Sequence, residues 1–274
     1  MVGQETIKSR LLISQSVSNL PNSMLFLGDC GCGKHTLANE LSSHYGLPLL
    51  DITKNISYES IEEIYLNPSQ AFYLINMDAI SERQQNALLK FIEEPLPNSF
   101  VVLLASSKNN LLETIVNRCV LYEFKPYTKE ELSQFINEED KLTLGEDGLK
   151  DILSLCTTPG QIINLNVKSL KGLHDLCDTM ISKMANARYS NALTIAKKIN
   201  YKDEYDKYDF NVFLNCYKQH LYSNYLETSS KLSLDLYNIV TKESELLAIT
   251  NINKEYFMEH LLTKLWERSK NEIK

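Results

Sequence analysis

The sequence of 274 residues lacks the features of membrane and secreted proteins. It has no uninterrupted apolar run long enough to cross a bilayer, and it does not open on a basic start, an apolar core and a small-residue cleavage site. None of its six cysteines forms a C-x-x-C pair, which argues against a zinc ribbon and against a disulfide framework. We therefore expect a cytoplasmic protein whose thiols stay reduced.

Blocks of basic residues are missing as well. The net charge is −7 at pH 7, and no stretch gathers lysine and arginine. Because nucleic-acid affinity rests on the neutralisation of phosphates, such a chain is a poor free-standing DNA binder, and contact with DNA is expected only within a larger assembly. The five histidines show no metal-ligand spacing, so we expect surface or core roles for them and predict no metal-binding residues.

What the chain does have is a glycine-rich loop of the pattern G-x-x-x-x-G-K. A strand-like apolar stretch precedes the loop and a helix-like stretch follows it, which is the context in which such a loop binds phosphate. The glycines allow backbone N–H groups to turn inward, and the lysine adds a positive charge at the start of the helix. The predicted phosphate-binding residues are Gly28, Gly31, Gly33 and Lys34.

Two groups that would hold Mg²⁺ are absent from this pattern. His35 stands where a serine or threonine is expected, and it offers nitrogen to a cation that prefers oxygen. Asn76 follows a buried strand at the place where an aspartate should orient the metal. The sequence therefore predicts phosphate binding without hydrolysis, while Thr36 and Asp78 are left open as unorthodox Mg²⁺ ligands.

Two regimes of hydrophobic pattern divide the chain near Pro126. Before it, short apolar strands alternate with helices, which indicates a parallel sheet covered by helices on both faces. Predicted strands are Met24–Leu27, Leu49–Ile52, Ala71–Ile75, Phe100–Ala105 and Val120–Phe124, with helices at Thr6–Leu20 and from a Ser81 cap to Glu94. After it every periodic segment is helical: Lys129–Ile136, Gly148–Cys156, Gly160–Leu165, Leu170–Met184, Arg188–Ile199, Asp209–Glu227, Ser233–Ile249 and Lys254–Arg268.

The predicted fold class is thus an α/β domain followed by helical domains. We expect a nucleotide-binding domain at 1–126, a small helical domain at 127–168 and an all-helical domain at 169–274. The last region carries more apolar positions than one solvated bundle surface is expected to need, which predicts that it oligomerises. Among these positions are Leu232, Leu236, Ile239, Leu261 and Leu265.

Further motifs resemble those of the clamp-loader AAA+ family. The stretch Gln85–Pro95 resembles the family signature NALLKxxEEP, and Asn117–Cys119 resembles its SRC motif with asparagine in place of serine. Val2–Glu5 is similar to the opening VGQ box near the adenine pocket, and Ser106 lies where the polar sensor-1 residue is expected. Thr250–Glu255 resembles the end of the bacterial delta-prime subunit. The motifs are collinear with the family over nearly the whole chain.

The resemblance implies an AAA+ nucleotide-binding domain, a helical lid and a C-terminal collar. Within the family the chain is most similar to the delta-prime subunit of bacterial DNA polymerase III, which keeps the fold without hydrolysing ATP and acts as a fixed wedge in a five-subunit ring. The resemblance implies that Arg118 is an arginine finger for the ATP site of a neighbouring subunit. It also implies other clamp-loader subunits, the sliding clamp and primer–template DNA as partners, and ATP or ADP bound weakly without hydrolysis.

Two departures from the family pattern bear on this interpretation. The sensor-2 arginine of active subunits is missing after Gly160, which favours a non-catalytic member. The zinc module of many bacterial relatives does not fit between Lys34 and Asn76, which indicates a compact, phage-type or divergent version. The alternatives left open are an active ATPase motor subunit of the gamma/tau or phage type, and an AAA+ scaffold unconnected with sliding clamps. For Arg118 itself, the alternative is an ion pair with an acidic neighbour in its own chain.

Overall fold

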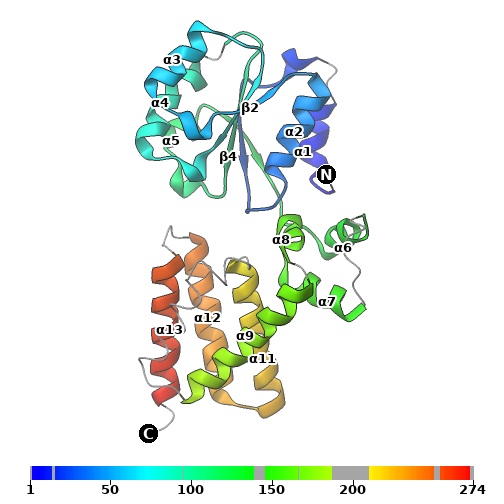
Figure 1. The fold of residues 1–274 in the computed structure, drawn as a ribbon, viewed down its shortest axis with the longest axis vertical. Helices are drawn as coiled ribbons and strands as arrows, with labels where there is room; N and C mark the ends of the chain where they lie inside the picture. Colours follow the sequence, from blue (N-terminus) through cyan, green and yellow to red (C-terminus); the bar gives the residue numbers. More distant parts are fainter. Residues whose placement is uncertain are drawn as a thin grey trace. The chain divides into compact units, whose positions relative to one another are not determined.

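The computed structural model describes residues 2–13, 16–94, 96–138, 146–165, 167–186, 210–249 and 254–271. The chain divides into two compact units (Figure 1). The first, here called the sheet unit, comprises Met1–Phe135 and Thr158–Gly160, and the second, the helical unit, comprises Ile136–Thr157 and Gln161–Lys274. The domain boundaries expected near residues 126 and 168 stay a prediction.

The sheet unit is built on a five-stranded sheet in the order β2-β3-β4-β1-β5, and every neighbouring pair is parallel. The central strands are buried along nearly their whole length, which is why their sequences read as continuous apolar runs. The predicted α/β class is therefore confirmed. The strands are β1 Ser23–Leu27, β2 Leu49–Asp51, β3 Phe72–Asn76, β4 Phe100–Ala105 and β5 Val120–Glu123.

Helices cover both faces of this sheet. On one side lie α1 (Glu5–Leu12) and α2 (Lys34–Tyr45); on the other lie α3 (Tyr58–Leu66), α4 (Glu82–Glu93) and α5 (Glu113–Val116) (Figure 1). The main core lies under the second group, where Phe91 of α4 meets Tyr73 of β3 edge to face at 5.1 Å. Helix α4 begins with a capping box between Ser81 and Gln84, as predicted.

Helix α1 is shorter than the sequence predicted. It ends at Leu12 instead of continuing to Leu20, and a short 3₁₀ helix follows at Val17–Asn19. The Ser16 side chain accepts a hydrogen bond from the Ser18 N–H and caps this turn. Serine side chains compete in this way for backbone groups, and here the local bond replaces the expected continuation of the helix.

The helical unit is made of helices that pack side by side, with α11 between α9 and α12, and α13 against α12 and α9 (Figure 1). Helix α6 (Lys129–Glu138) spans the division between the two units. The predicted helix Arg188–Ile199 and the stretch at residues 250–253 lie outside the described residues. The remaining helices are α7 Glu146–Leu155, α8 Pro159–Asn164, α9 Val167–Asn186, α11 Phe210–Thr228, α12 Lys231–Ile249 and α13 Lys254–Asn271.

Burial in the helical unit corrects one argument from the sequence. Leu236, Leu261 and Leu265 were expected to exceed the needs of a single bundle, yet all three are buried inside it. Helices α12 and α13 pack against one another and against α11 and α9, so these leucines fill the core of their own unit, and only Leu232 and Ile239 of the set are partly exposed. An oligomerisation surface on this unit has to be sought elsewhere.

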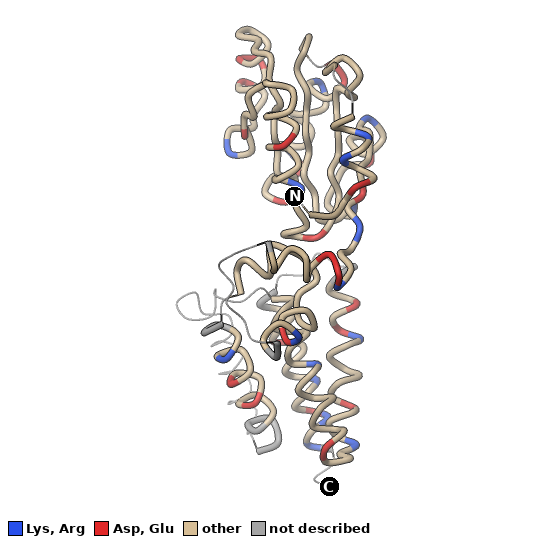
Figure 2. Tube along the Cα trace, turned by 90° about the vertical axis from the view of Figure 1, so that its right-hand side faces the viewer, with Lys and Arg blue, Asp and Glu red and all other residues tan. Residues whose placement is uncertain are grey.

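The surface of both units is mixed in charge. Lysine, arginine, aspartate and glutamate are interspersed along the described helices and loops (Figure 2). Among the described residues, no helix combines the length and the apolar character needed to cross a membrane.

Candidate functional site

The glycine-rich loop connects β1 to α2, and its glycines are required by geometry. Gly31 and Gly33 adopt φ angles of 79° and 96°, in the left-handed region that side chains disfavour. Gly28 has no room for a side chain, because a β-carbon there would lie 2.7 Å from Cβ of Phe124. The loop ends at the N-terminus of α2, where the helix dipole favours an anion. This part of the chain therefore has the geometry of a phosphate loop.

Lys34 is turned back onto this loop. Its ammonium group donates to the carbonyl of Gly28 and, at 2.9 Å, to the carbonyl of Asp29. A phosphate entering the loop has to compete with these carbonyls for the same positive charge. The lysine that is expected to bind phosphate thus has partners within its own loop.

The next three carbonyls of the loop receive hydrogen bonds from outside it. Such bonds order the loop without a ligand, because each one fixes a peptide group whose other face can turn toward an anion. The Thr158 hydroxyl donates to the Cys30 carbonyl at 3.1 Å, and the Gly160 N–H donates to the Gly31 carbonyl at 3.0 Å. The Tyr127 hydroxyl donates to the Cys32 carbonyl at 2.9 Å.

Gly160 approaches Gly31 backbone to backbone. A β-carbon on Gly160 would lie 2.5 Å from Cα of Gly31, and neither backbone has a flexible side chain that could move aside. We expect Gly160→Ala to lower the free energy of unfolding by about 1–3 kcal/mol, the usual cost of overpacking. Helix propensity alone favours alanine at this position and would raise the free energy of unfolding. The sign of the change, measured by chemical denaturation, therefore decides between overpacking and helix propensity.

A matched control for this substitution is Gly148→Ala, which adds the same methyl group to α7. Alanine is the better helix former, so this variant is expected to be neutral or more stable. If Gly160→Ala were as stable as the Gly148→Ala control, the close approach of the two glycines would not constrain the loop.

The carboxyl ends of β3 and β4 meet beside the loop. Asp78 lies just beyond the end of β3, in a 3₁₀ turn, and its carboxylate accepts the Ser106 N–H at 3.0 and 3.2 Å. The Asn76 amide oxygen accepts the Asp78 N–H at 3.1 Å. The Gly28 N–H donates to the Ala105 carbonyl, next to Ser106. The structure therefore brings four of the predicted or alternative site residues to one edge of the sheet.

His35 and Thr36 lie in the first turn of α2, and both are exposed. Nδ1 of His35 is 2.9 Å from the side-chain nitrogen of Asn39, one turn along the same helix. Thr36 lines a shallow hollow formed by α2 and by Leu12 at the end of α1, together with Asn39 and Ser43. Both side chains are thus placed among residues of α2, and their roles toward a metal stay predictions.

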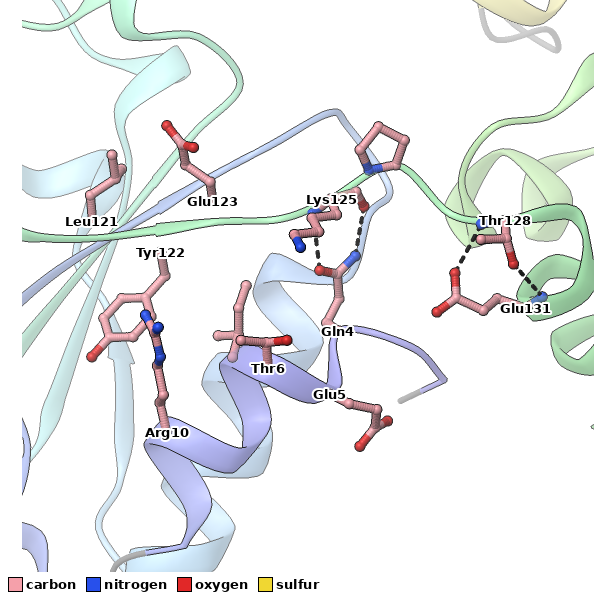
Figure 3. Close-up of a pocket in the computed structure, with 12 residues that line it drawn as sticks. Gln4, Glu5, Thr6, Arg10, Leu121, Tyr122, Glu123, Lys125, Thr128 and Glu131 are labelled. Atoms are coloured by element: carbon pink, nitrogen blue, oxygen red, sulfur yellow. Dashed lines mark hydrogen bonds between the residues drawn. The ribbon is translucent and has the colours of Figure 1, made fainter.

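The VGQ box at Val2–Glu5, here called the N-terminal box, is hydrogen-bonded to the chain segment that follows β5. The Gln4 amide donates to the Lys125 carbonyl at 2.7 Å and accepts the Lys125 N–H at 3.0 Å (Figure 3). The Tyr127 hydroxyl, which donates to the Cys32 carbonyl of the phosphate loop, shares its proton with the Val2 carbonyl at 3.3 Å. Burial raises the pKa of Tyr127 to about 12. Tyr127 therefore links the N-terminal box to the loop, a role that no local sequence signal marked.

A cavity of about 610 Å³ opens beside this link. Its volume is in the range of small-molecule sites. Figure 3 shows Gln4 on one wall and the β5 segment on the other. Lining residues with polar or aromatic side chains include Gln4, Arg10, Tyr122, Thr128 and Glu131. The cavity lies where the resemblance places the box near the adenine pocket.

Helix α4 holds the segment that carries Arg118. The buried Gln85 side chain donates to the Asn110 carbonyl at 2.8 Å and accepts the Leu112 N–H at 3.0 Å, just before α5. Eight residues later on α4, Glu93 forms an ion pair with Arg118, just after α5. Helix α4 therefore holds the α5 segment at both ends, through Gln85 before α5 and through Glu93 after it. These contacts join the two signature motifs.

Arg118 has the partner within its own chain that the sequence left as an alternative. Besides the ion pair with Glu93, its Nη1 donates to the Thr114 carbonyl at 2.9 Å. The side chains of Arg118 and Glu93 are 40% and 44% exposed, so the pair is solvent-screened and its guanidinium is open to a second partner.

Comparisons with known proteins agree with these motifs. A family model described as "DNA polymerase III, delta subunit" matches residues 49–128. The replication factor C small subunit of Staphylothermus marinus is 26% identical over 175 residues, 57% of this chain and 53% of that protein. The DNA polymerase III subunit delta′ of Haemophilus influenzae is 31% identical over 107 residues, 35% of this chain and 33% of that protein.

The matched region spans about half the length of the first of these relatives. Among solved structures, a single-residue variant of Thermotoga maritima RuvB superposes with a TM-score of 0.52 at 15% identity, covering 99% of this chain and 88% of that one. At that identity the likeness concerns the fold alone. The predicted resemblance to clamp-loader AAA+ proteins is confirmed, and the predicted fold class with it.

Proposed function

From the confirmed resemblance to clamp-loader AAA+ proteins, we propose that this chain is a clamp-loader subunit of DNA replication, of the non-catalytic delta-prime type. The observation that carries the finer assignment is that the phosphate loop keeps its glycines and Lys34, while His35 replaces the expected hydroxyl and Asn76, at the end of β3, replaces the expected carboxylate for Mg²⁺. Phosphoryl transfer depends on that metal to neutralise developing charge, so a loop without it favours binding over hydrolysis.

Nucleotide binding is proposed to be weak. Gly28, Gly31 and Gly33 supply the loop geometry, and the cavity beside Gln4 is large enough for a base. Against this, Lys34 has to leave two loop carbonyls before it can reach a phosphate. Binding of ATP or ADP therefore replaces the two Lys34–carbonyl hydrogen bonds with bonds to phosphate, and the net gain in binding free energy is small.

Arg118 is proposed to act on the ATP of a neighbouring subunit. A guanidinium is permanently charged and presents a planar fork of donors, which suits charge that spreads over phosphoryl oxygens. Its exposure and its place after α5 leave it able to exchange the Glu93 carboxylate for a phosphate. Glu93 is then the partner of the guanidinium when no neighbour is bound.

The helical unit is proposed to serve as the collar that joins other clamp-loader subunits into a ring, through which the chain reaches the sliding clamp and primer–template DNA. Apolar side chains exposed on it offer a surface for such packing. On α11, Tyr222 and Leu226 lie one turn apart and are 45% and 63% exposed.

Steady-state ATP turnover by the purified chain is expected to equal background, because His35 and Asn76 stand in place of the hydroxyl and the carboxylate that are expected to hold Mg²⁺. The measurement is phosphate release with ATP and Mg²⁺, first by the chain alone and then with partner subunits and primed DNA. Hydrolysis by the chain alone that disappears in Lys34→Ala, but persists in the exposed-lysine control Lys54→Ala, contradicts this proposal and identifies a motor subunit. In that case Asp78, exposed at the edge of the sheet, becomes the candidate metal ligand.

The same experiment also tests the alternative that the chain is an AAA+ scaffold outside the clamp loader. A chain that fails to associate with clamp-loader subunits, and leaves their DNA-stimulated turnover unchanged, is a scaffold unconnected with sliding clamps. Association without turnover of its own supports the proposed role.

A further inference from the structure

The helical unit contains a cluster of imidazole and thiol groups that the proposed function does not use. His174 lies on α9, and Cys216 and His220 lie on α11. Their ligand atoms all lie within 4.8 Å of one another. Nδ1 of His174 is 2.7 Å from Nε2 of His220 and 3.7 Å from Sγ of Cys216. Three side chains of types that bind transition metals therefore converge on one point.

Cys177 supplies a fourth group of the same kind. It is fully buried on α9, one turn from His174, and its thiol lies near that of Cys216, beside the group of three whose ligand atoms converge. The spacings His-x-x-Cys on α9 and Cys-x-x-x-His on α11 place the two members of each pair on one face of their helix. The sequence search for C-x-x-C pairs missed this arrangement, because each half-site combines one cysteine with one histidine.

Two carboxylates orient the imidazole rings from behind. Oδ2 of Asp151 is 3.1 Å from Nε2 of His174, and Oδ1 of Asp178 is 2.7 Å from Nδ1 of His220. A carboxylate that accepts a hydrogen bond from the far N–H keeps the ring proton on that nitrogen and leaves the lone pair of the near nitrogen directed at a metal. Both rings therefore have the outer partner that metal-binding histidines usually have.

The distances among His174, Cys216 and His220 fit a tetrahedral ion with little adjustment, and Cys177 has to move toward them to complete the site. Zn–N bonds of about 2.0 Å and Zn–S bonds of about 2.3 Å place tetrahedral ligands about 3.3 Å apart for two nitrogens and about 3.5 Å apart for nitrogen and sulfur. The observed nitrogen–sulfur distance of 3.7 Å matches, and the two ring nitrogens, now 2.7 Å apart, need to separate by roughly 0.6 Å.

We propose that His174, Cys177, Cys216 and His220 form a structural zinc site that joins α9 to α11. Two thiolates balance the charge of the dication, which matters because both cysteines are fully buried. Four protein ligands leave no open position, as in structural rather than catalytic sites. The proposal replaces the expectation of purely surface or core roles for these histidines, and it is independent of the clamp-loader assignment.

The test uses the full chain, purified under reducing conditions. Elemental analysis is expected to find one zinc per chain, and removal of the metal by a chelator is expected to lower the unfolding temperature reversibly. Replacement by Co²⁺ is expected to give the intense visible bands of a tetrahedral ion together with thiolate-to-cobalt charge transfer. The cobalt spectrum is measured on the wild-type chain, so it does not depend on the folding of a variant.

Variants then assign the ligands. Cys216→Ser and His220→Gln are expected to abolish the charge-transfer bands or shift them and to weaken zinc binding by at least 100-fold. Asp178→Asn keeps all four ligands and is expected to weaken zinc binding 10- to 100-fold, the usual effect of losing an outer carboxylate. Matched controls from the same unit are Cys156→Ser, a buried thiol outside the cluster, and His260→Gln, an exposed imidazole.

Three outcomes overturn the proposal. One is a folded wild-type chain that holds less than a tenth of an equivalent of zinc after incubation with the metal. Another is a cobalt spectrum without thiolate charge transfer. The third is a disulfide between Cys177 and Cys216, found by peptide mapping of chain purified without reductant, since a disulfide removes both thiolate ligands.

Discussion

In a clamp-loader complex reconstituted with its partner subunits, Arg118→Ala is expected to slow DNA-stimulated ATP hydrolysis while leaving assembly intact. An arginine finger supplied in trans is worth roughly 10³–10⁵ in rate where it has been studied best. The loss in total turnover is expected to be smaller, because the other ATP sites keep their own arginines. Pre-steady-state measurement of the first turnover isolates the affected site.

The side chain is exposed, so folding should survive the change. Breaking a solvent-screened pair with Glu93 costs about 0–1 kcal/mol. Arg118→Lys is expected to restore little of the rate, since a point charge does not reproduce the planar fork. Glu93→Gln removes the ion pair and keeps the guanidinium, and it is expected to retain most of the rate.

These variants separate two roles of Arg118. Equal DNA-stimulated rates for the wild-type subunit and Arg118→Ala, at matched assembly, assign Arg118 to a structural role in its own chain. An equal loss in Arg118→Ala and Glu93→Gln assigns the effect to the ion pair that positions the α5 segment.

Charge placed on the exposed face of α11 is expected to prevent assembly. Leu226→Asp puts a carboxylate where the collar proposal requires apolar packing, and burying an unpaired charge is costly. Combined with Tyr222→Ala, it is expected to weaken association with partner subunits by 100-fold or more, which corresponds to about 3 kcal/mol. Titration calorimetry or analytical ultracentrifugation with the partners measures this change.

The control for this surface is Leu226→Met, which keeps the apolar area and is expected to assemble normally. Thermal unfolding of the isolated Leu226→Asp and Leu226→Met variants should match that of the wild-type chain, because Leu226 is 63% exposed, whereas Tyr222→Ala also removes ring contacts with Tyr225 and Tyr237. Undiminished association of the charged variant shows that the collar, if the helical unit forms one, uses another face.

The elements that the sequence predicted best are those with local causes. The β4 stretch Phe100–Ala105 is buried at every position, so its apolar run could only be read as a covered strand. The capping box at Ser81 is likewise contained within four residues. The end of α1 was missed because a serine–backbone bond outweighed a hydrophobic period that continued past it.

The sequence predicted the phosphate loop itself, but it did not predict the residues that hold the loop and the N-terminal box in place. The glycines of the loop reflect local backbone angles, which a motif records. By contrast, Gln4 finds its partner 121 residues away at Lys125, and Tyr127 reaches Cys32 across 95 residues. Neither spacing follows from a helix or strand period. The imidazole cluster escaped for the same reason, since His174 and His220 lie 46 residues apart.

The grip of α4 on the α5 segment has a mechanical consequence. Gln85 and Glu93 are separated by about 12 Å along one rigid helix, at 1.5 Å per residue, and each fixes a different end of the segment. A tilt or slide of α4 is therefore transmitted to the arginine without first unfolding anything between them. A partner that binds the outer face of α4 and displaces this helix therefore also displaces the Arg118 guanidinium. The orientation of the guanidinium then depends on contacts made well away from it.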